Sequence, residues 1–193
     1  MQAFTTLHAA AVPLDLANVD TDQIVPARFL RHPRSAGYGN FLFRDLRERD
    51  PEFILDRPEY RGAQILVTAE NFGCGSSREA AVWALTGAGF RAWIAPSFGD
   101  IFFENSFKNA ALPIVLPAGR VAGLRSQLHA APGTSLAINL ARQTLRFPDG
   151  GIEGFDVDPF RKECLLAGID EIALTLRHEQ EIAAYEARHL TPP

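Results

Sequence analysis

Residues 71–79, Asn-Phe-Gly-Cys-Gly-Ser-Ser-Arg-Glu, contain the residue types of this sequence that are best suited to chemistry. Gly73 and Gly75, one residue apart, let the backbone adopt conformations that other residues avoid and let a ligand approach closely. A short apolar run precedes the segment and a helical pattern follows it, and the first N–H groups of a helix lack internal partners and attract anions. Arg78 stands in the first turn of that expected helix, where a lone cation is unfavourable unless an anion lies beside it. The segment therefore predicts a site for a carboxylate or a similar anion.

The same segment also has a purely structural interpretation. Ser76 and Glu79 match a capping box, in which each side chain accepts a hydrogen bond from the other residue's backbone N–H, and the local pattern alone favours this interpretation. Cys74 at a helix start is a candidate nucleophile, but a small packed residue is the favoured interpretation. The sequence has no phosphate loop, no third glycine in register for a dinucleotide site, and no Gly-x-Ser-x-Gly elbow of a hydrolase.

Two carboxylates stand one residue apart in Asp20-Thr21-Asp22. They are candidates for a metal site, but no third ligand follows at a suitable spacing. A turn held by hydrogen bonds that the carboxylates accept from nearby backbone N–H groups is the favoured interpretation.

The composition is that of an ordinary globular protein. The chain has 193 residues, of which 47% are hydrophobic and 22% charged, so disorder is a poor interpretation and one domain is expected. A formal net charge of −4 provides none of the basic surface typical of nucleic-acid binders. The first residues lack the pattern of a signal peptide, and the apolar runs are far shorter than the roughly 18–20 residues that span a membrane. We therefore expect a soluble, cytoplasmic protein.

Cys74 and Cys164 are the only two cysteines. They cannot supply the usual ligands of a zinc site or an iron–sulfur cluster, so no metal is expected on this chain. A pair of free thiols in a reducing compartment fits better than a disulfide.

Apolar runs and helical patterns alternate through the centre of the chain. This alternation predicts a parallel β-α-β core within one mixed α/β domain. The expected strands are residues 4–7, 64–68, 92–95, 112–116, 136–139 and 143–146. The expected helices are residues 77–85, 96–109, 121–129, 159–166 and 178–188, while residues 172–176 fit a strand or a helix. Residues 31–38 are expected to form a mobile loop, and residues 44–50 an exposed helix or loop.

Residues 73–79, followed by residues 95–102 (Ala-Pro-Ser-Phe-Gly-Asp-Ile-Phe), resemble the swivelling domain of the aconitase family. More closely, the chain resembles the small subunits of bacterial 3-isopropylmalate dehydratases, also called isopropylmalate isomerases. Motifs at residues 18–24 and 168–176 extend this resemblance over nearly the whole chain. Ala80 departs from the family, in which a histidine usually follows the Arg-Glu pair.

The resemblance implies a fold, a reaction and a partner. The fold would be a single three-layer β/β/α swivelling domain over residues 1–193, with a C-terminal helical extension. The reaction would interconvert 2-isopropylmalate and 3-isopropylmalate, by removing water and adding it back, in leucine biosynthesis. Such a hydro-lyase needs a base beside a carboxylate clamp, and a Lewis acid because hydroxide is a poor leaving group. The resemblance implies that this acid is a [4Fe–4S] cluster on a separate large subunit, so that the chain binds no cofactor itself and acts only in a heterodimer or heterotetramer.

The resemblance also implies roles for individual residues. Ser76 would be the catalytic base, acting as an alkoxide, and Ser77 and Arg78 would bind substrate. A loop that begins at Phe29, Leu30 and Arg31 would select the substrate side group, and an apolar pair beside a cation suits a malate with a branched apolar substituent. Arg34 is a second candidate carboxylate ligand. The residues implied to be structural and near the site are Asp20, Thr21, Asp22, Gly73 and Gly75.

Two other functions remain open from the sequence. One is the small subunit of a related hydro-lyase that acts on another 2-hydroxy di- or tricarboxylate, such as a relative of citramalate or homocitrate. The other is a non-catalytic carboxylate-binding domain, which the Ala80 departure keeps open.

Overall fold

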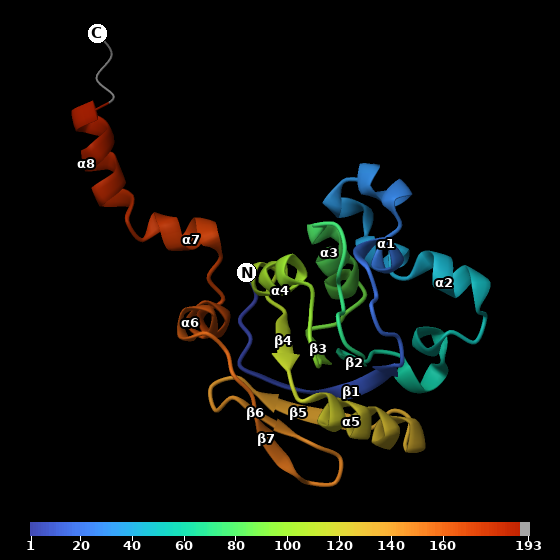
Figure 1. Cartoon of the computed structure of the whole chain (residues 1–193). Helices are drawn as coiled ribbons and strands as arrows, with labels where there is room; N and C mark the ends of the chain where they lie inside the picture. Colours follow the sequence, from blue (N-terminus) through green and yellow to red (C-terminus); the bar gives the residue numbers. More distant parts are fainter. Residues whose placement is uncertain (190–193) are drawn as a thin grey trace.

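A seven-stranded mixed sheet forms the centre of the molecule (Figure 1). The computed structural model describes residues 1–189. Four parallel strands lie in the order β4 (Leu112–Val115), β3 (Ala92–Ala95), β2 (Ile65–Thr68) and β1 (Thr6–Leu14). From β1 the sheet continues through the antiparallel strands β5 (Ser135–Asn139), β6 (Thr144–Arg146) and β7 (Ile152–Gly154). The predicted α/β class and β-α-β core are confirmed.

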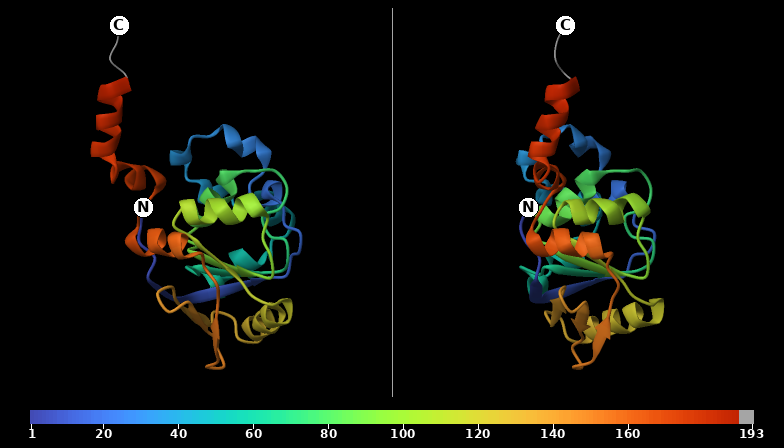
Figure 2. Two further views of the ribbon diagram at one scale, coloured as in Figure 1. Left: turned by 60° about the vertical axis from the view of Figure 1, so that its left-hand side comes forward. Right: turned by 90° about the vertical axis from the view of Figure 1, so that its left-hand side faces the viewer.

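Helices cover both faces of the parallel strands (Figures 1 and 2). On one side lie α3 (Glu79–Gly87) and α4 (Asp100–Lys108), and on the other lies α5 (Ala118–Ala130). All four residues of β2 and of β3 are buried, as expected for parallel strands covered on both faces. Their side chains alternate between two cores: Leu66 and Trp93 pack with α3, while Ile65, Val67 and Ile94 pack with α5.

The long connection between β1 and β2 consists of short elements, of which residues 21–24 and 38–41 lie against α3 and residues 54–60 lie against β1 (Figure 1). It contains the helices α1 (Thr21–Ile24) and α2 (Arg44–Arg49) and single 3₁₀ turns at Ala27–Arg31, Arg34–Ala36, Tyr38–Phe41, Ile54–Asp56 and Pro58–Tyr60. Residues 44–50 therefore include a helix, one of the two predicted possibilities. The expected loop at residues 31–38 contains a 3₁₀ turn, and its mobility stays a prediction.

Three helices end the described chain: α6 (Pro159–Ala167), α7 (Glu171–Leu176) and α8 (Glu179–His189). Residues 172–176, which the sequence left open, are thus helical. In both views α8 points away from the sheet, and every residue of α8 is exposed (Figure 2). Ile172, Leu176 and Tyr185 present apolar surface on α7 and α8, each with more than half of its area exposed. No helix within residues 1–189 is long and apolar enough to cross a membrane.

Several predicted boundaries were wrong, and the reasons are tertiary. Strand β1 extends to Leu14 instead of ending at Leu7, because it pairs with β5 along its first half and with β2 along its second. Strand β7 was not predicted. Helix α4 begins at Asp100 rather than at residue 96, since residues 97–99 are extended and bind the segment after β2. The Asn71 N–H donates to Ser97 Oγ (2.9 Å), and the Gly99 N–H donates to the Phe72 carbonyl (2.9 Å).

Candidate functional site

Three loops meet where the parallel strands β1, β2 and β3 end. Isolated bridges pair Asp20 with Cys74 and Phe72 with Phe98, so the loops after these strands lie side by side. The Gly73 N–H donates to the Val19 carbonyl (2.7 Å). The carboxyl ends of parallel strands are the usual place for ligand sites in α/β sheets. The geometry therefore brings the two motifs at residues 18–24 and 71–79 into one site.

The chain at Gly73 is packed too tightly for any other residue. Its φ of +73° lies in the left-handed region, and a Cβ atom at this position would be 2.2 Å from Cγ of Phe102. Gly75 also has a positive φ, of +83°, and faces Asp20. These two glycines shape the turn that delivers the next residues to the surface.

Ser76 and Ser77 are exposed in the loop between this turn and α3. The Ser76 carbonyl accepts a hydrogen bond from Thr21 Oγ1 (2.7 Å), which ties the loop to the buried start of α1. The capping box that the local pattern favoured was wrong. Helix α3 begins at Glu79, Arg78 occupies the N-cap position with φ −136° and ψ 104°, and no side chain caps the helix. Neither serine side chain therefore caps the helix.

A capping box does occur, at α1. Asp20 Oδ1 accepts from the Gln23 N–H (2.7 Å), and the Asp20 N–H donates to Gln23 Oε1 (3.1 Å). The predicted turn, held by a carboxylate that accepts from nearby backbone, is thus confirmed for Asp20. Asp22, on the same helix, forms an ion pair with Arg78. Arg78 is the more buried partner, with 18% of its side chain exposed against 49% for Asp22.

The residues expected to select the substrate side group lie in the 3₁₀ turn Ala27–Arg31. Phe29 stacks on Phe41 with a centroid distance of 4.3 Å and packs against the core on the α3 side. Leu30 and Arg31 are exposed. We call residues 27–41 the recognition segment.

Arg34 does not join the serines. Its Nη2 donates to Asn109 Oδ1 (2.9 Å), and its guanidinium carbon lies 5.0 Å from the centroid of the Trp83 ring. Within residues 1–189, no hydrogen bond or ion pair connects Arg34 to Ser76, Ser77 or Arg78. Asn109 and Trp83 were not singled out from the sequence, because nothing local distinguishes a helix-end asparagine or a helix tryptophan that contacts a segment far away in the chain.

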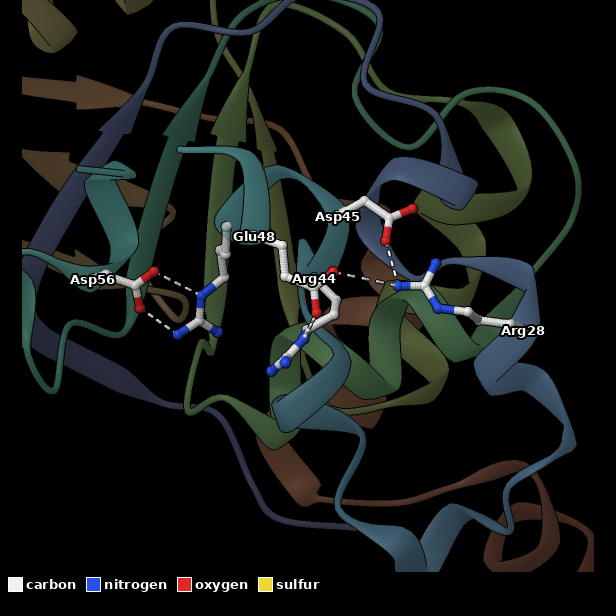
Figure 3. Close-up of polar contacts among 6 residues, drawn as sticks. Arg28, Arg44, Asp45, Glu48 and Asp56 are labelled. Atoms are coloured by element: carbon white, nitrogen blue, oxygen red, sulfur yellow. Dashed lines mark hydrogen bonds and ion pairs between the residues drawn. The ribbon is translucent and has the colours of Figure 1, made fainter. Parts of the chain in front are cut away.

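Ion pairs hold the first turn of the recognition segment to α2 (Figure 3). Arg28 binds Asp45 and lies 4.0 Å from Glu48, which also accepts from Arg44 (2.6 Å). The hydrogen bond to Asp45 raises the pKa of Arg28, and the same bond lowers the pKa of Asp45. Because the Asp45 pKa is lowered, the ion pair is fully formed above the ordinary carboxyl pKa of about 3.9 and is lost as the pH falls through the lowered value.

Replacing Arg28 by glutamine is expected to raise the pKa of Asp45 toward its ordinary value, because the largest cause of the shift is removed. NMR titration of the side-chain carboxyl carbons measures this directly. Asp149 is the matched control, since its pKa is lowered mainly by the Gly151 N–H and is expected to stay unchanged. An unchanged Asp45 pKa in Arg28→Gln would contradict the assigned contact.

The residues of this chain do not fit an iron–sulfur cluster. Cys74 lies in the loop after β2, Cys164 lies in α6, and both are free. Among the described residues, no three His, Cys, Asp or Glu side chains are grouped so that they could hold a metal ion. A [4Fe–4S] cluster is usually held by four cysteines, which this chain cannot supply.

Three family models match most of the chain. Residues 1–119 match the aconitase C-terminal domain family, and residues 122–159 match a family described as LeuD_N. Residues 171–191 match the C-terminal domain of the 3-isopropylmalate dehydratase small subunit. The boundary between the first two matches falls inside one sheet, because β1 pairs with β5.

The similar proteins are named as 3-isopropylmalate dehydratases or their small subunits. 3-Isopropylmalate dehydratase small subunit 1 of Bordetella parapertussis is 52% identical over 98% of this chain and 94% of its own length. The small subunit of Methylibium petroleiphilum is 50% identical over the same shares of the two chains. A crystal structure of the 3-isopropylmalate dehydratase of Methanocaldococcus jannaschii covers 93% of this chain and 99% of its own, with a TM-score of 0.69 and 26% identity. The chain therefore belongs to the family of 3-isopropylmalate dehydratase small subunits.

Proposed function

We propose that this chain forms the substrate-binding half of a hydro-lyase active site that interconverts 2-isopropylmalate and 3-isopropylmalate in leucine biosynthesis. The names of the relatives confirm the prediction that the chain is one component of a lyase and works with a large subunit. The observation that carries the proposal is the exposed pair Ser76-Ser77 beside the partly buried Arg78, in a loop whose side chains cap no helix.

Ser76 is the proposed base for the substrate C–H beside a carboxylate. As an alkoxide, its Oγ accepts the proton, and the electron pair of the C–H bond forms the C=C bond as the hydroxyl group departs. A serine alkoxide needs strong positive potential, and both Arg78 and the N-terminal end of α3, which no side chain caps, have the right sign. The hydroxyl leaving group needs an acid that no residue of this loop provides, and we assign that role to the large subunit.

Arg78 and Ser77 are the proposed ligands of a substrate carboxylate. Asp22 engages one terminal nitrogen of Arg78, Nη1, which orients the guanidinium and leaves its other N–H groups available. Asp20 and Thr21 hold the neighbouring backbone, so the proposed ligands and the proposed base are fixed by the same pair of loops. Arg34 as a second carboxylate ligand remains a prediction.

Arg78→Lys is expected to lower kcat/KM by about 10- to 100-fold, mostly through KM, because lysine keeps the charge but loses the planar fork that matches a carboxylate. Steady-state kinetics of the complex with its large subunit measure the change. Arg146→Lys, at the exposed last residue of β6, is the control and should behave as wild type. Wild-type constants for Arg78→Lys would contradict the assignment.

We extend the same proposal to the partner of this chain, to the cofactor of the complex and to its location in the cell. The [4Fe–4S] cluster would sit on the large subunit, in a heterodimer or heterotetramer, and two free thiols suit a cytoplasmic location. We also propose that residues 1–193 act as one domain, with α7 and α8 as its helical extension.

The test is reconstitution. The chain is co-expressed with its cognate large subunit, the cluster is rebuilt, and hydration and dehydration are followed with isopropylmalates, citramalate and homocitrate relatives. Preference for isopropylmalates supports the proposal, and preference for another hydroxy acid supports the related hydro-lyase. A complex that binds carboxylates but turns over none of them is a non-catalytic binding domain.

A further inference from the structure

The second half of the recognition segment is docked on α3. The ring of Tyr38 meets the ring of Trp83 edge-on at 5.4 Å, and the Tyr38 hydroxyl donates to the His32 carbonyl (2.9 Å). Gly39 and Gly87 touch backbone to backbone, since a Cβ atom on Gly39 would lie 2.4 Å from the Gly87 carbonyl carbon. The position of the segment is therefore set by contacts with the helix that follows the proposed base.

Asn109 connects this docked segment to the start of α3. It lies at the C-terminal end of α4, and its Nδ2 donates to Glu79 Oε1 (2.8 Å) and to the Asn105 carbonyl (2.9 Å). Its Oδ1 accepts from Arg34 Nη2 (2.9 Å). A carboxylate requires a donor and a guanidinium requires an acceptor, and a side-chain amide offers both. Three elements, the recognition segment, α3 and α4, thus meet at one amide group.

Two of the three partners of this amide, Glu79 and Arg34, lie next to proposed site residues. Glu79 directly follows Arg78, and Arg34 follows the turn that carries Phe29, Leu30 and Arg31. A shift of the recognition segment would move the residues that select the side group relative to the residues that bind the carboxylate. The guanidinium of Arg34 also lies over the face of the Trp83 ring. The ring and the Asn109 contact together fix both the position and the orientation of the guanidinium.

We propose that Asn109 is a positioning residue of this enzyme: through its contact with Arg34 it holds the recognition segment against α3, in register with Ser76 and Arg78. This inference rests on the proposed function. Asn109 touches neither substrate nor reacting atoms, so its loss acts on substrate binding rather than on the chemical step.

Asn109→Leu, which removes all three hydrogen bonds at similar volume, is the first test. In the complex with the large subunit, KM should rise roughly three- to tenfold, the worth of a net hydrogen bond, while kcat stays within about twofold. In the full-length chain, trypsin should cleave after Arg31 and Arg34 several times faster as the segment undocks. Asn139→Leu is the matched control, because the Asn139 side chain accepts from the Arg142 N–H at the end of β5, and it should leave both readouts unchanged.

An exchange variant separates positioning from general damage. In Glu79→Gln combined with Asn109→Asp, the new glutamine amide donates to the new carboxylate, which still accepts from Arg34. The carboxylate oxygen that replaces Nδ2 also faces the Asn105 carbonyl, to which it cannot donate, so KM and cleavage rates should return only part of the way to the wild-type values.

Unchanged KM and cleavage in Asn109→Leu, or an exchange variant as impaired as Asn109→Leu, would overturn the inference. A wild-type complex that fails to convert isopropylmalate would instead overturn the proposed function, and the cleavage rates would still report on docking.

Discussion

Replacing Ser76 by alanine is expected to lower kcat/KM of the reconstituted complex by about 10³-fold, with most of the loss in kcat. General base catalysis by a positioned side chain typically contributes factors of 10² to 10⁴. The substitution removes one exposed hydroxyl oxygen, while the hydrogen bond that holds the loop uses the Ser76 carbonyl, which alanine keeps. The melting temperature should therefore stay unchanged.

Two serines serve as controls for this experiment. Ser77→Ala should lower kcat/KM by only about tenfold, the effect of losing one hydrogen bond to substrate. Ser126→Ala, on the exposed face of α5, should change nothing. Solvent exchange of the substrate C–H proton gives a second readout, because this exchange reports proton abstraction separately from departure of the hydroxyl group. If Ser76→Ala retains wild-type exchange, another group is the base, and the assignment of Ser76 fails while the fold and family stand.

The sequence correctly predicted the local backbone of the candidate site, which is a turn that leads into a helix. Gly73, Gly75, Ser76 and Arg78 lie within six consecutive residues, so their types alone indicated a turn that leads to a helix with an anion site. The sequence could not decide between a cap and a free serine, since the pattern at Ser76 and Glu79 fits both. Tertiary contacts decide between the two: the Ser76 carbonyl is bound to Thr21, Arg78 is extended, and the helix begins only at Glu79.

Two of the features that the sequence missed depend on contacts between residues far apart in the chain. Residues 97–99 were assigned to a helix by their pattern, but they pair with the loop after β2, and the backbone hydrogen bonds of that pairing replace a helical turn. The link from Arg34 to Asn109 joins residues 75 positions apart in the sequence. No local periodicity reports such a contact, whereas the alternation of apolar runs and helices sufficed to predict the parallel core.

Replacing Gly73 by alanine is expected to destabilise the protein by about 3 kcal/mol, the largest stability effect of a single methyl group at this site. The left-handed backbone at φ +73° costs a non-glycine residue roughly 1–2 kcal/mol. The added Cβ would also lie 2.2 Å from Phe102 Cγ, in a ring packed against Phe72 and Trp93, and overpacking of a core costs about 1–3 kcal/mol. For a chain of this size the melting temperature should fall by roughly 6–12 °C.

Two further variants separate the causes of this loss. Gly123→Ala adds a methyl group inside α5 where no atom lies within 4 Å, and it should raise stability by about 0.5–1 kcal/mol, because alanine favours the helix. Phe102→Ala removes Cγ and Cδ1, the ring atoms that would lie 2.2 and 2.7 Å from the methyl group added in Gly73→Ala, so combining the two changes should cost less than the sum of the single changes. Calorimetry of the wild type, the Gly73 and Phe102 single variants and the double variant measures the coupling. Strict additivity would mean that the backbone conformation alone demands glycine, whereas a favourable coupling energy shows that α4 packs directly against the turn that presents Ser76.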